Sequence, residues 1–470
     1  MIAVVVGIAA FARFHEIGRR SLWFDEGVTL GMLHLPLTEF FRAAWQSVGL
    51  NNQILYYLVL RQWHVLGEDE AILRAFSAIL STGAVALTCI LGRRLFGTAA
   101  GITAGIVLSV HWYAIRMAQE ARSYGLTVFL VSLAALLLAR FVDSGRRRDV
   151  VGWVLASSLA LYAHFFALFP IAAQVIALPV LGWASLMRRR ALIAGSLAIL
   201  AFALPIIVFL LLAPPSLLHW VRATGLVEIG EILSGGNTYL LLFHVVLFAV
   251  ALARGFGESH PNRRWGIFLI LFWAAFPPLA MAIISLRHTI LIDRYVSMSI
   301  PAWAIVVGMV VGPLIARRPS RVLGLGVLVF FVVSELGMLN RLYSEPFEDW
   351  RTPARSVAAS TRPGDAIVYN SPWGGLAFGY YLDQSSRRPE NIQPGSLLFQ
   401  GAFDPAVAVG RERVWVVLSR YDPNFHKWVR RLLKGSHPVI SRRNFGAIRV
   451  ILYDVKPRRE GDGAFGSPGP

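Results

Sequence analysis

Residues 116–148 read RMAQEARSYGLTVFLVSLAALLLARFVDSGRRR, and this stretch decides the fold class. Its middle part, residues 124–142, is an almost unbroken apolar run with the length of a helix that crosses a bilayer, about 20 residues. Three arginines, Arg146 to Arg148, follow the run, and the charged turn Gln119–Ser123 precedes it. The stretch therefore predicts a membrane-spanning helix. Its C-terminal end is followed by three arginines, and its N-terminal end is preceded by a turn with residues of both charges.

The same pattern recurs along the chain, which has 470 residues, 56% of them hydrophobic and 15% charged. Soluble domains contain about 25% charged residues, so this composition favours the bilayer. We expect an α-helical polytopic membrane protein with about eleven transmembrane helices. The predicted spans are 1–15, 72–92, 98–116, 124–142, 150–165, 167–187, 191–213, 238–253, 265–286, 295–316 and 322–340.

Arginine clusters follow every second membrane span or so, and their positions indicate which loops lie on which side of the membrane. The clusters lie at 93–94, 146–148, 188–190, 263–264 and 317–321, on the side that the positive-inside rule makes cytoplasmic. This placement explains the net charge of +18 better than a nucleic-acid partner, which would require the cations on one soluble face. We expect an inner-membrane protein whose other loops face outward.

Two features test this topology. Arg13, Arg19 and Arg20 would lie on the outer side, against the rule, unless the chain starts a few residues late. The apolar run 150–187 is divided at His164 into two spans, and a single long span there would exchange the sides of every later loop.

The domain prediction places a transmembrane domain at 1–343 and a soluble, extracytoplasmic α/β domain at 344–456, with a disordered tail at 457–470. Strands are expected at 366–369, 414–418 and 449–453, and helices at 353–360, 375–383 and 425–434. Within the outer loop 16–71, apolar residues recur at helical spacing from Leu37 to Trp45. They predict an amphipathic interfacial helix, which could shape a substrate groove or simply anchor the loop.

The sequence Trp23-Phe24-Asp25-Glu26 puts two carboxylates just after the first span. Ionisable residues near lipid are costly and are candidates for function. A carboxylate can act as a general base on an alcohol that attacks an electrophile. On an extended segment, adjacent side chains point apart, so only one of the two would face a given substrate atom.

Other candidates lie on the same predicted face. Arg122 could neutralise a phosphate, although Arg116 and Glu120 have the spacing of a simple helix-end ion pair. His164 could contact a ligand or be a hydrogen-bonded residue at a helix end. Arg287 and Arg294 are outward arginines that could bind an anionic headgroup or extend to the interface.

At these residues the chain resembles the polyprenyl-phosphate-dependent GT-C glycosyltransferases, in the bacterial branch related to protein O-mannosyltransferases and lipid A aminoarabinose transferases. The motifs are SLWFDE at 21–26, LYYL at 55–58, the segment 71–77, GRRLFG at 92–97, QEARSY at 119–124, His164-Phe165, Arg294-Tyr295, EDWR at 348–351 and PGD at 363–365. The chain departs from the family at 51–54, where NNQI replaces a His-Pro-Pro type of sequence.

The resemblance implies inverting transfer of a sugar from a polyprenyl-phosphate donor to a lipid, glycan or protein acceptor outside the cytoplasm. Asp25 would be the general base, Glu26 its partner and Glu120 a second acid. Donor-phosphate candidates are Arg122, Arg294 and Arg287, and the candidates for substrate or metal contacts are His164, Tyr124 and Tyr295. No cofactor is implied with certainty, and the resemblance leaves a divalent cation open.

Two rival functions remain at this stage. A lipid-linked-sugar flippase or other transporter would carry ionisable residues deep in its helices, whereas the predicted mid-helix positions here are almost wholly apolar. A membrane receptor with a soluble sensor domain is the third reading.

Overall fold

The computed structural model describes residues 1–46, 53–181, 186–212, 226–287, 290–344, 348–369, 372–383, 390–391, 411–419 and 438–455. The chain forms two compact units. Unit 1 contains Met1–Gly18 and Ala44–Glu345, and unit 2 contains Arg19–Ala43 and Pro346–Pro470. The expected division at 343/344 differs from this one, because part of the predicted outer loop 16–71 clusters with the C-terminal domain.

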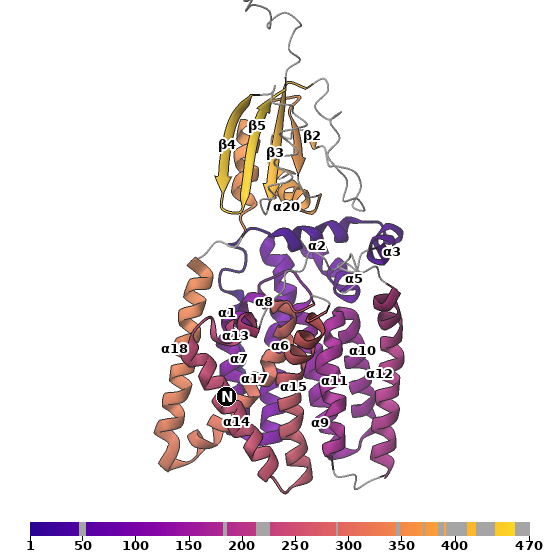
Figure 1. Cartoon of the computed structure of the whole chain (residues 1–470), viewed down its shortest axis with the longest axis vertical. Coiled ribbons are helices and arrows are strands. Elements are labelled where there is room, and N and C mark those ends of the chain that lie inside the picture. Colours follow the sequence, from indigo (N-terminus) through magenta and orange to yellow (C-terminus); the bar gives the residue numbers. More distant parts are fainter. Residues whose placement is uncertain are drawn as a thin grey trace, which may run out of the picture. The chain divides into compact units, whose positions relative to one another are not determined.

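Unit 1 is helical (Figure 1). Its longer helices are α1 (Ile2–Phe14), α5 (Ile54–Trp63), α6 (Glu70–Phe96), α7 (Thr98–Val110), α8 (Trp112–Ala118), α9 (Tyr124–Ser144), α10 (Arg147–Ala163), α11 (Leu168–Ile176), α12 (Leu186–Leu212), α13 (Leu226–Ser234), α14 (Thr238–Gly257), α15 (Pro261–Ser285), α17 (Ile300–Ala316) and α18 (Arg321–Ser344). The short α16 (Asp293–Val296) and the 3-10 turn Ser297–Ser299 lead directly into α17.

A helix occupies each of the eleven predicted ranges. Within the described residues, seven helical stretches are long and apolar enough to cross a membrane, and the bent pair α7 and α8 makes an eighth if it is one span. The other three ranges hold α1, α10 and α11, which have 13, 17 and 9 residues. A straight crossing needs about 20 residues, so the count of eleven stays a prediction. The break at His164 is confirmed, since α10 ends at Ala163.

Small residues let helices of unit 1 approach closely. A Cβ built on Gly312 of α17 would lie 2.6 Å from the Cα of Ala100 in α7, and one on Gly308 would clash with the Ala100 carbonyl. On another side of α7, Gly105 packs against the buried Cys89 of α6. Small residues at such crossings are typical of membrane helices, where lipid supplies little hydrophobic force between helices.

The predicted amphipathic helix is present as α3 (Leu37–Gln46), which joins the two units. Leu37, Phe41 and Trp45 recur at intervals of four residues and are exposed, while Phe40 is buried. The exposed apolar stripe agrees with an interfacial helix.

Unit 2 is built on a five-stranded sheet (Figure 1) with strand order β2-β1-β3-β5-β4. The strands are β1 (Ala366–Tyr369), β2 (Glu390–Asn391), β3 (Arg413–Ser419), β4 (Val439–Phe445) and β5 (Ile448–Asp454). β1 pairs in parallel with β2 and β3, whereas β5 pairs antiparallel with β3 and β4. The helices are α2 (Phe24–His34), α19 (Arg351–Ser360) and α20 (Pro372–Asp383).

All three predicted strands are therefore confirmed, as are the predicted helices at 353–360 and 375–383. Strands β1 and β3 are buried along their whole length, which is why they appear in the sequence as continuous apolar runs. The predicted helix at 425–434 and the tail at 457–470 lie outside the described residues.

Asp365 anchors the start of β1. It accepts hydrogen bonds from the Arg413 guanidinium, from the backbone N–H of Arg362 at 2.9 Å and from the Trp415 indole at 3.0 Å. Burial alone would raise the pKa of Asp365, but these hydrogen bonds outweigh it and hold the pKa below its usual value. The ionised carboxylate is therefore the form that the folded domain prefers.

This preference predicts an acid-sensitive sheet. Because the folded state lowers the pKa of Asp365, its contribution is fully present above the unfolded value, near 3.9, and is lost as the pH falls through the lower folded value. Asp365→Asn should destabilise the domain at pH 7 by about 1–3 kcal/mol, since the buried Arg413 loses the negative charge and one of the two oxygens that accept its hydrogen bonds. Hydrogen-exchange protection of the β1 and β3 amides in the full chain measures both effects. Equal protection in the variant and the wild type at pH 7 would contradict the prediction.

Candidate functional site

The turn Gln119–Ser123 joins α8 to α9 and is tightly held in unit 1. The Arg122 N–H donates to the Glu120 carbonyl at 2.8 Å, and the Arg122 carbonyl accepts from Ser77 Oγ at 3.0 Å. Arg122 Nη1 donates to Tyr57 Oη at 3.1 Å, and the side chain is only 7% exposed. Tyr57 belongs to the LYYL motif, so the structure joins two of the sequence motifs through Arg122.

Aromatic rings gather beside this turn. The His164 ring lies 5.7 Å from Tyr124 and 4.9 Å from Tyr295, measured between ring centroids. Phe166 stacks on Tyr295 at 4.1 Å. His164 Nδ1 accepts the Phe166 N–H at 3.2 Å, so a neutral His164 carries its proton on Nε2. His164 is 1% exposed and packs inside the aromatic cluster, against Tyr124 and Tyr295.

Two arginine side chains lie near the His164 ring. The Arg122 and Arg294 guanidinium groups both lie within electrostatic range of His164. Arg294 is partly exposed at the start of α16, and its carbonyl accepts from Ser297 Oγ at 2.6 Å. The structure therefore brings together five of the predicted residues: Tyr124, Arg122, His164, Arg294 and Tyr295. Two arginines near one buried aromatic surface are suited to binding an anion.

The turn also carries an acidic residue, Glu120, which is paired with Arg116. Glu120 Oε1 is 3.8 Å from Arg116 Nε, so the helix-end pair expected as the rival reading of Glu120 is present. Glu120, Arg116 and Asp293 all act electrostatically on Tyr113, which is buried in α8. Asp293 was not among the predicted site residues, and its position beside Arg294 is the signal that could have identified it.

Arg287 differs from the other predicted arginines. It is exposed in the turn after α15, and within the described residues its side chain makes no hydrogen bond or ion pair. Its role in binding phosphate stays a prediction. Among the residues that the structure describes, no group of three or more His, Cys, Asp or Glu could hold a metal ion.

Asp25 and Glu26 belong to unit 2, in the first turn of α2. The expectation that this segment is extended is wrong, because α2 begins at Phe24. Glu26 is 1% exposed, and its Oε2 accepts the Trp23 N–H at 3.2 Å. Glu26 is thus occupied with capping the helix, as expected for a glutamate at the third helical position. Asp25 is half-buried.

A broken helix leads to the turn 119–123. The axes of α7 and α8 differ by 63°, and such a break frees the last carbonyls of the first helix. Arg13 of α1 meets them: it donates to the carbonyls of Leu108 at 3.1 Å and Ser109 at 3.2 Å. Arg13 is fully buried, so it is not a loop arginine of the kind to which the positive-inside rule applies.

The far side of the break is capped by an acid. The buried Glu335 of α18 accepts the first N–H of α8, that of Trp112, at 2.7 Å. At the other end of α8, Gln119 Nε2 donates to the His15 carbonyl at 2.8 Å and to Tyr343 Oη at 3.1 Å. The Arg13 guanidinium donates to carbonyls at the end of α7, and the Glu335 carboxyl group accepts an N–H at the start of α8. Each group therefore satisfies backbone groups that the break leaves without a helical partner. Helices α1 and α18 therefore hold α8, and with it the turn that carries Glu120 and Arg122.

Arg13→Met should weaken this arrangement. Each buried carbonyl left without a donor costs about 1–3 kcal/mol, so thermal unfolding in detergent should shift clearly downward. Arg318→Met is the matched control, because Arg318 is exposed and lies in a predicted cytoplasmic cluster. If both variants unfold at the same temperature, Arg13 does not stabilise the break.

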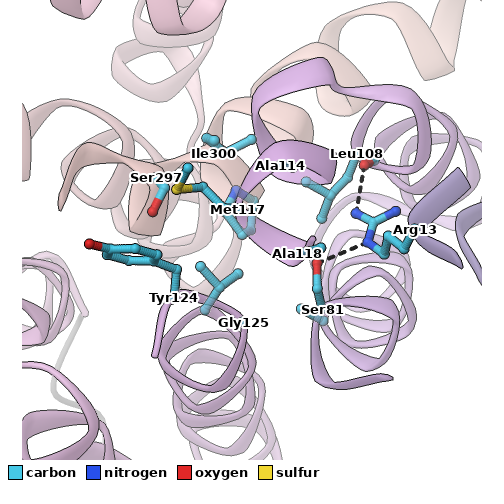
Figure 2. Close-up of a pocket in the computed structure, with 13 residues that line it drawn as sticks. Arg13, Ser81, Leu108, Ala114, Met117, Ala118, Tyr124, Gly125, Ser297 and Ile300 are labelled. Atoms are coloured by element: carbon cyan, nitrogen blue, oxygen red, sulfur yellow. Dashed lines mark hydrogen bonds between the residues drawn. The ribbon is translucent and has the colours of Figure 1, made fainter. Parts of the chain in front are cut away.

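A small cavity is lined by residues that flank the turn, among them Ala118 and Tyr124 (Figure 2). Its polar lining comes from Arg13, Ser81, Tyr124 and Ser297, and Arg13 Nε donates to Ser81 Oγ at 2.9 Å. With about 20 Å³, the cavity has room for one water molecule but not for a sugar or a lipid.

No family model and no curated protein matches this chain. Solved structures do match it in fold. ArnT from Cupriavidus metallidurans aligns over 97% of both chains in the apo state, with 16% identity and a TM-score of 0.61. The same enzyme bound to undecaprenyl phosphate aligns over 97% of this chain and 98% of that chain, again with 16% identity and a TM-score of 0.61.

Archaeal oligosaccharyltransferase AglB from Archaeoglobus fulgidus, in complex with an inhibitory peptide and a dolichol-phosphate, aligns over 88% of this chain and 69% of that chain. The identity is 10% and the TM-score 0.50. ArnT, a lipid A aminoarabinose transferase, and AglB are both GT-C glycosyltransferases. The resemblance drawn from the sequence motifs is thus confirmed at the level of the fold.

Proposed function

We propose that this protein transfers a sugar from a polyprenyl-phosphate donor to a hydroxyl group of a cell-envelope acceptor, with inversion at the anomeric carbon. The observation that carries the proposal is the fold match over nearly the whole of both chains to ArnT, including a structure bound to undecaprenyl phosphate. The arginines and aromatic rings around His164 support it, because a lipid phosphate needs cations beside an apolar surface.

In the proposed reaction, Asp25 accepts the proton of the acceptor hydroxyl. The acceptor oxygen forms a bond to the anomeric carbon on the face opposite the phosphate, and the bond from that carbon to the phosphate oxygen breaks. Polyprenyl phosphate leaves with one additional negative charge. A carboxylate can serve as the base because the hydroxyl proton becomes acidic only as the new bond forms.

The leaving phosphate is assigned to the two arginines of unit 1. Arg294 is the more exposed of the two and is proposed as the direct contact, while Arg122 adds positive charge from its buried position. Cations placed where charge develops stabilise the transition state more than the ground state. We assign Tyr124 and Tyr295 to contacts with the donor, with His164 packed against both rings. Glu120 is proposed as a second acid.

The extracytoplasmic placement of these residues is part of the proposal. It is supported by the arginine clusters at the opposite ends of the helices and by the confirmed break at His164. A reporter fused after residue 345 should register outside the cytoplasm. A cytoplasmic signal would place the candidate residues on the wrong side for an envelope acceptor.

The direct test uses the full chain in nanodiscs with undecaprenyl-phosphate hexoses and pentoses, each radiolabelled in the sugar, and an envelope extract as acceptor. Transfer of label to the acceptor, with release of undecaprenyl phosphate, is the expected result. Absence of transfer from every donor would overturn the proposal.

A flippase for lipid-linked sugars is the second candidate, and the broken helix favours it. Discontinuous helices and buried ionisable residues, such as Arg13 and Glu335, are common in transporters. An assay in liposomes distinguishes the two functions. A flippase exposes a fluorescent lipid-linked sugar to an external quencher even when no acceptor is present. A transferase consumes the donor only when an acceptor is present.

A further inference from the structure

The start of helix α2, which carries Asp25, is held by residues from the far end of the chain. Glu348 Oε2 accepts the Phe24 N–H at 3.1 Å and the Trp350 indole N–H at 3.2 Å. Glu26 takes the neighbouring Trp23 N–H. The first N–H groups of a helix have no partner within it, so these two glutamates supply acceptors that the helix needs.

The residues just before α2 are tied to the same part of unit 2. Ser21 Oγ donates to the Glu348 carbonyl at 2.9 Å and accepts the Trp350 N–H at 3.0 Å. The Leu22 N–H donates to Tyr381 Oη at 2.6 Å. These contacts fix the chain on the N-terminal side of Asp25 through the Ser21 hydroxyl and the Leu22 backbone.

Helix α2 also lies unusually close to α20. A Cβ added to Gly27 would lie 2.7 Å from the backbone nitrogen of Ala377, and one added to Gly31 would lie 2.7 Å from Leu376 Cδ1. The two glycines are one helical turn apart and therefore share a face. Their contact with α20 sets the rotation of α2 about its axis, and hence the direction in which Asp25 points.

We propose that the C-terminal α/β domain positions the catalytic carboxylate, with Glu348 and Tyr381 as positioning residues. The inference rests on the proposed function, in which Asp25 is the base. The domain is then a working part of the transferase, because it fixes the backbone of residues 21–24 and the rotation of α2. Small displacements of a catalytic group are costly, with about 10² in rate for 1 Å.

The test compares Glu348→Ala, Glu348→Gln and Tyr381→Phe with wild type in the full chain, by kcat, KM and the Kd for undecaprenyl phosphate. Glu348→Ala should lower kcat by about tenfold or more, with KM and Kd nearly unchanged. Glu348→Gln keeps the shape and one acceptor oxygen, so it should recover part of the loss. Tyr381→Phe removes a single acceptor and should have a smaller effect.

Asp349→Ala is the matched control. Asp349 caps α19 in the same domain by accepting the Arg351 and Thr352 N–H groups at 3.0 and 3.1 Å. Among the residues that the structure describes, it makes no hydrogen bond to α2. A loss of kcat as large as that of Glu348→Ala would mean general weakening of the domain and would overturn the positioning role. Hydrogen exchange of the α2 amides gives a readout independent of transfer: it should be faster in Glu348→Ala and unchanged in Asp349→Ala.

A double variant separates this inference from the proposed function. If Glu348 acts through Asp25, Asp25→Asn with Glu348→Ala should be no slower than Asp25→Asn alone, since the base is already absent. Additive losses would overturn the positioning role. Full activity of Asp25→Asn would instead refute the assignment of the base, whatever Glu348→Ala does.

Discussion

Asp25→Asn is expected to lower the rate of sugar transfer by at least ~10², the usual contribution of a general base. Asparagine has nearly the same shape as aspartate, but its amide cannot take the acceptor proton. The loss should appear in kcat, and the Kd for undecaprenyl phosphate should stay unchanged. Steady-state transfer in nanodiscs, together with binding of undecaprenyl phosphate measured by native mass spectrometry, checks both statements.

The adjacent Glu26 provides the comparison. Its Oε2 caps Trp23, and Glu26→Gln keeps an oxygen that can accept the same N–H. This variant should therefore retain most of the activity. If Glu26→Gln loses as much activity as Asp25→Asn, or if Asp25→Asn transfers sugar at the rate of wild type, Asp25 is not the base.

The second large effect concerns the affinity for undecaprenyl phosphate. Hydrogen bonds to charged groups contribute about 1.5–3 kcal/mol each, so Arg294→Gln should weaken binding by about 10- to 10²-fold. Arg122→Gln should weaken it too, although part of its effect will reflect the lost contact with Tyr57. The dependence of affinity on salt should decrease in both variants, because fewer ionic contacts remain.

Two controls define this prediction. Undecaprenol has the same chain without phosphate, and its binding should be insensitive to either substitution. Arg318→Gln changes an exposed arginine of a predicted cytoplasmic cluster and should leave the affinity for undecaprenyl phosphate unchanged. Equal losses for the alcohol and the phosphate would show that the two arginines support the apolar surface and do not bind the anion.

Several elements could be predicted because their causes are local in the sequence. A long apolar run favours a helix, so a helix lies in every predicted range, although α1, α10 and α11 are shorter than a straight crossing. β1 and β3 are buried on both faces and therefore consist almost entirely of apolar residues. Arg122, His164 and Arg294 could be grouped because their helix ends were assigned to one membrane face.

Other features depend on contacts between distant residues. The carboxyl group of Glu335 in α18 and the guanidinium of Arg13 in α1 cap the two sides of one break. No spacing in the sequence links these two residues to each other. The capping role of Glu26 had a local signal, since a glutamate at the third position of a helix often accepts the N–H before it.

By itself, the sequence determined that this is a polytopic helical protein with a small α/β domain, and its motifs pointed to the GT-C fold. Hydrophobic length and periodicity are properties of neighbouring residues, so they can be read along the chain. Only the tertiary structure decided that the segment bearing Asp25 belongs to the same compact unit as the C-terminal domain. Glu348 and Phe24 are 324 residues apart, and the hydrogen bond between them exists only because the folded chain brings them together.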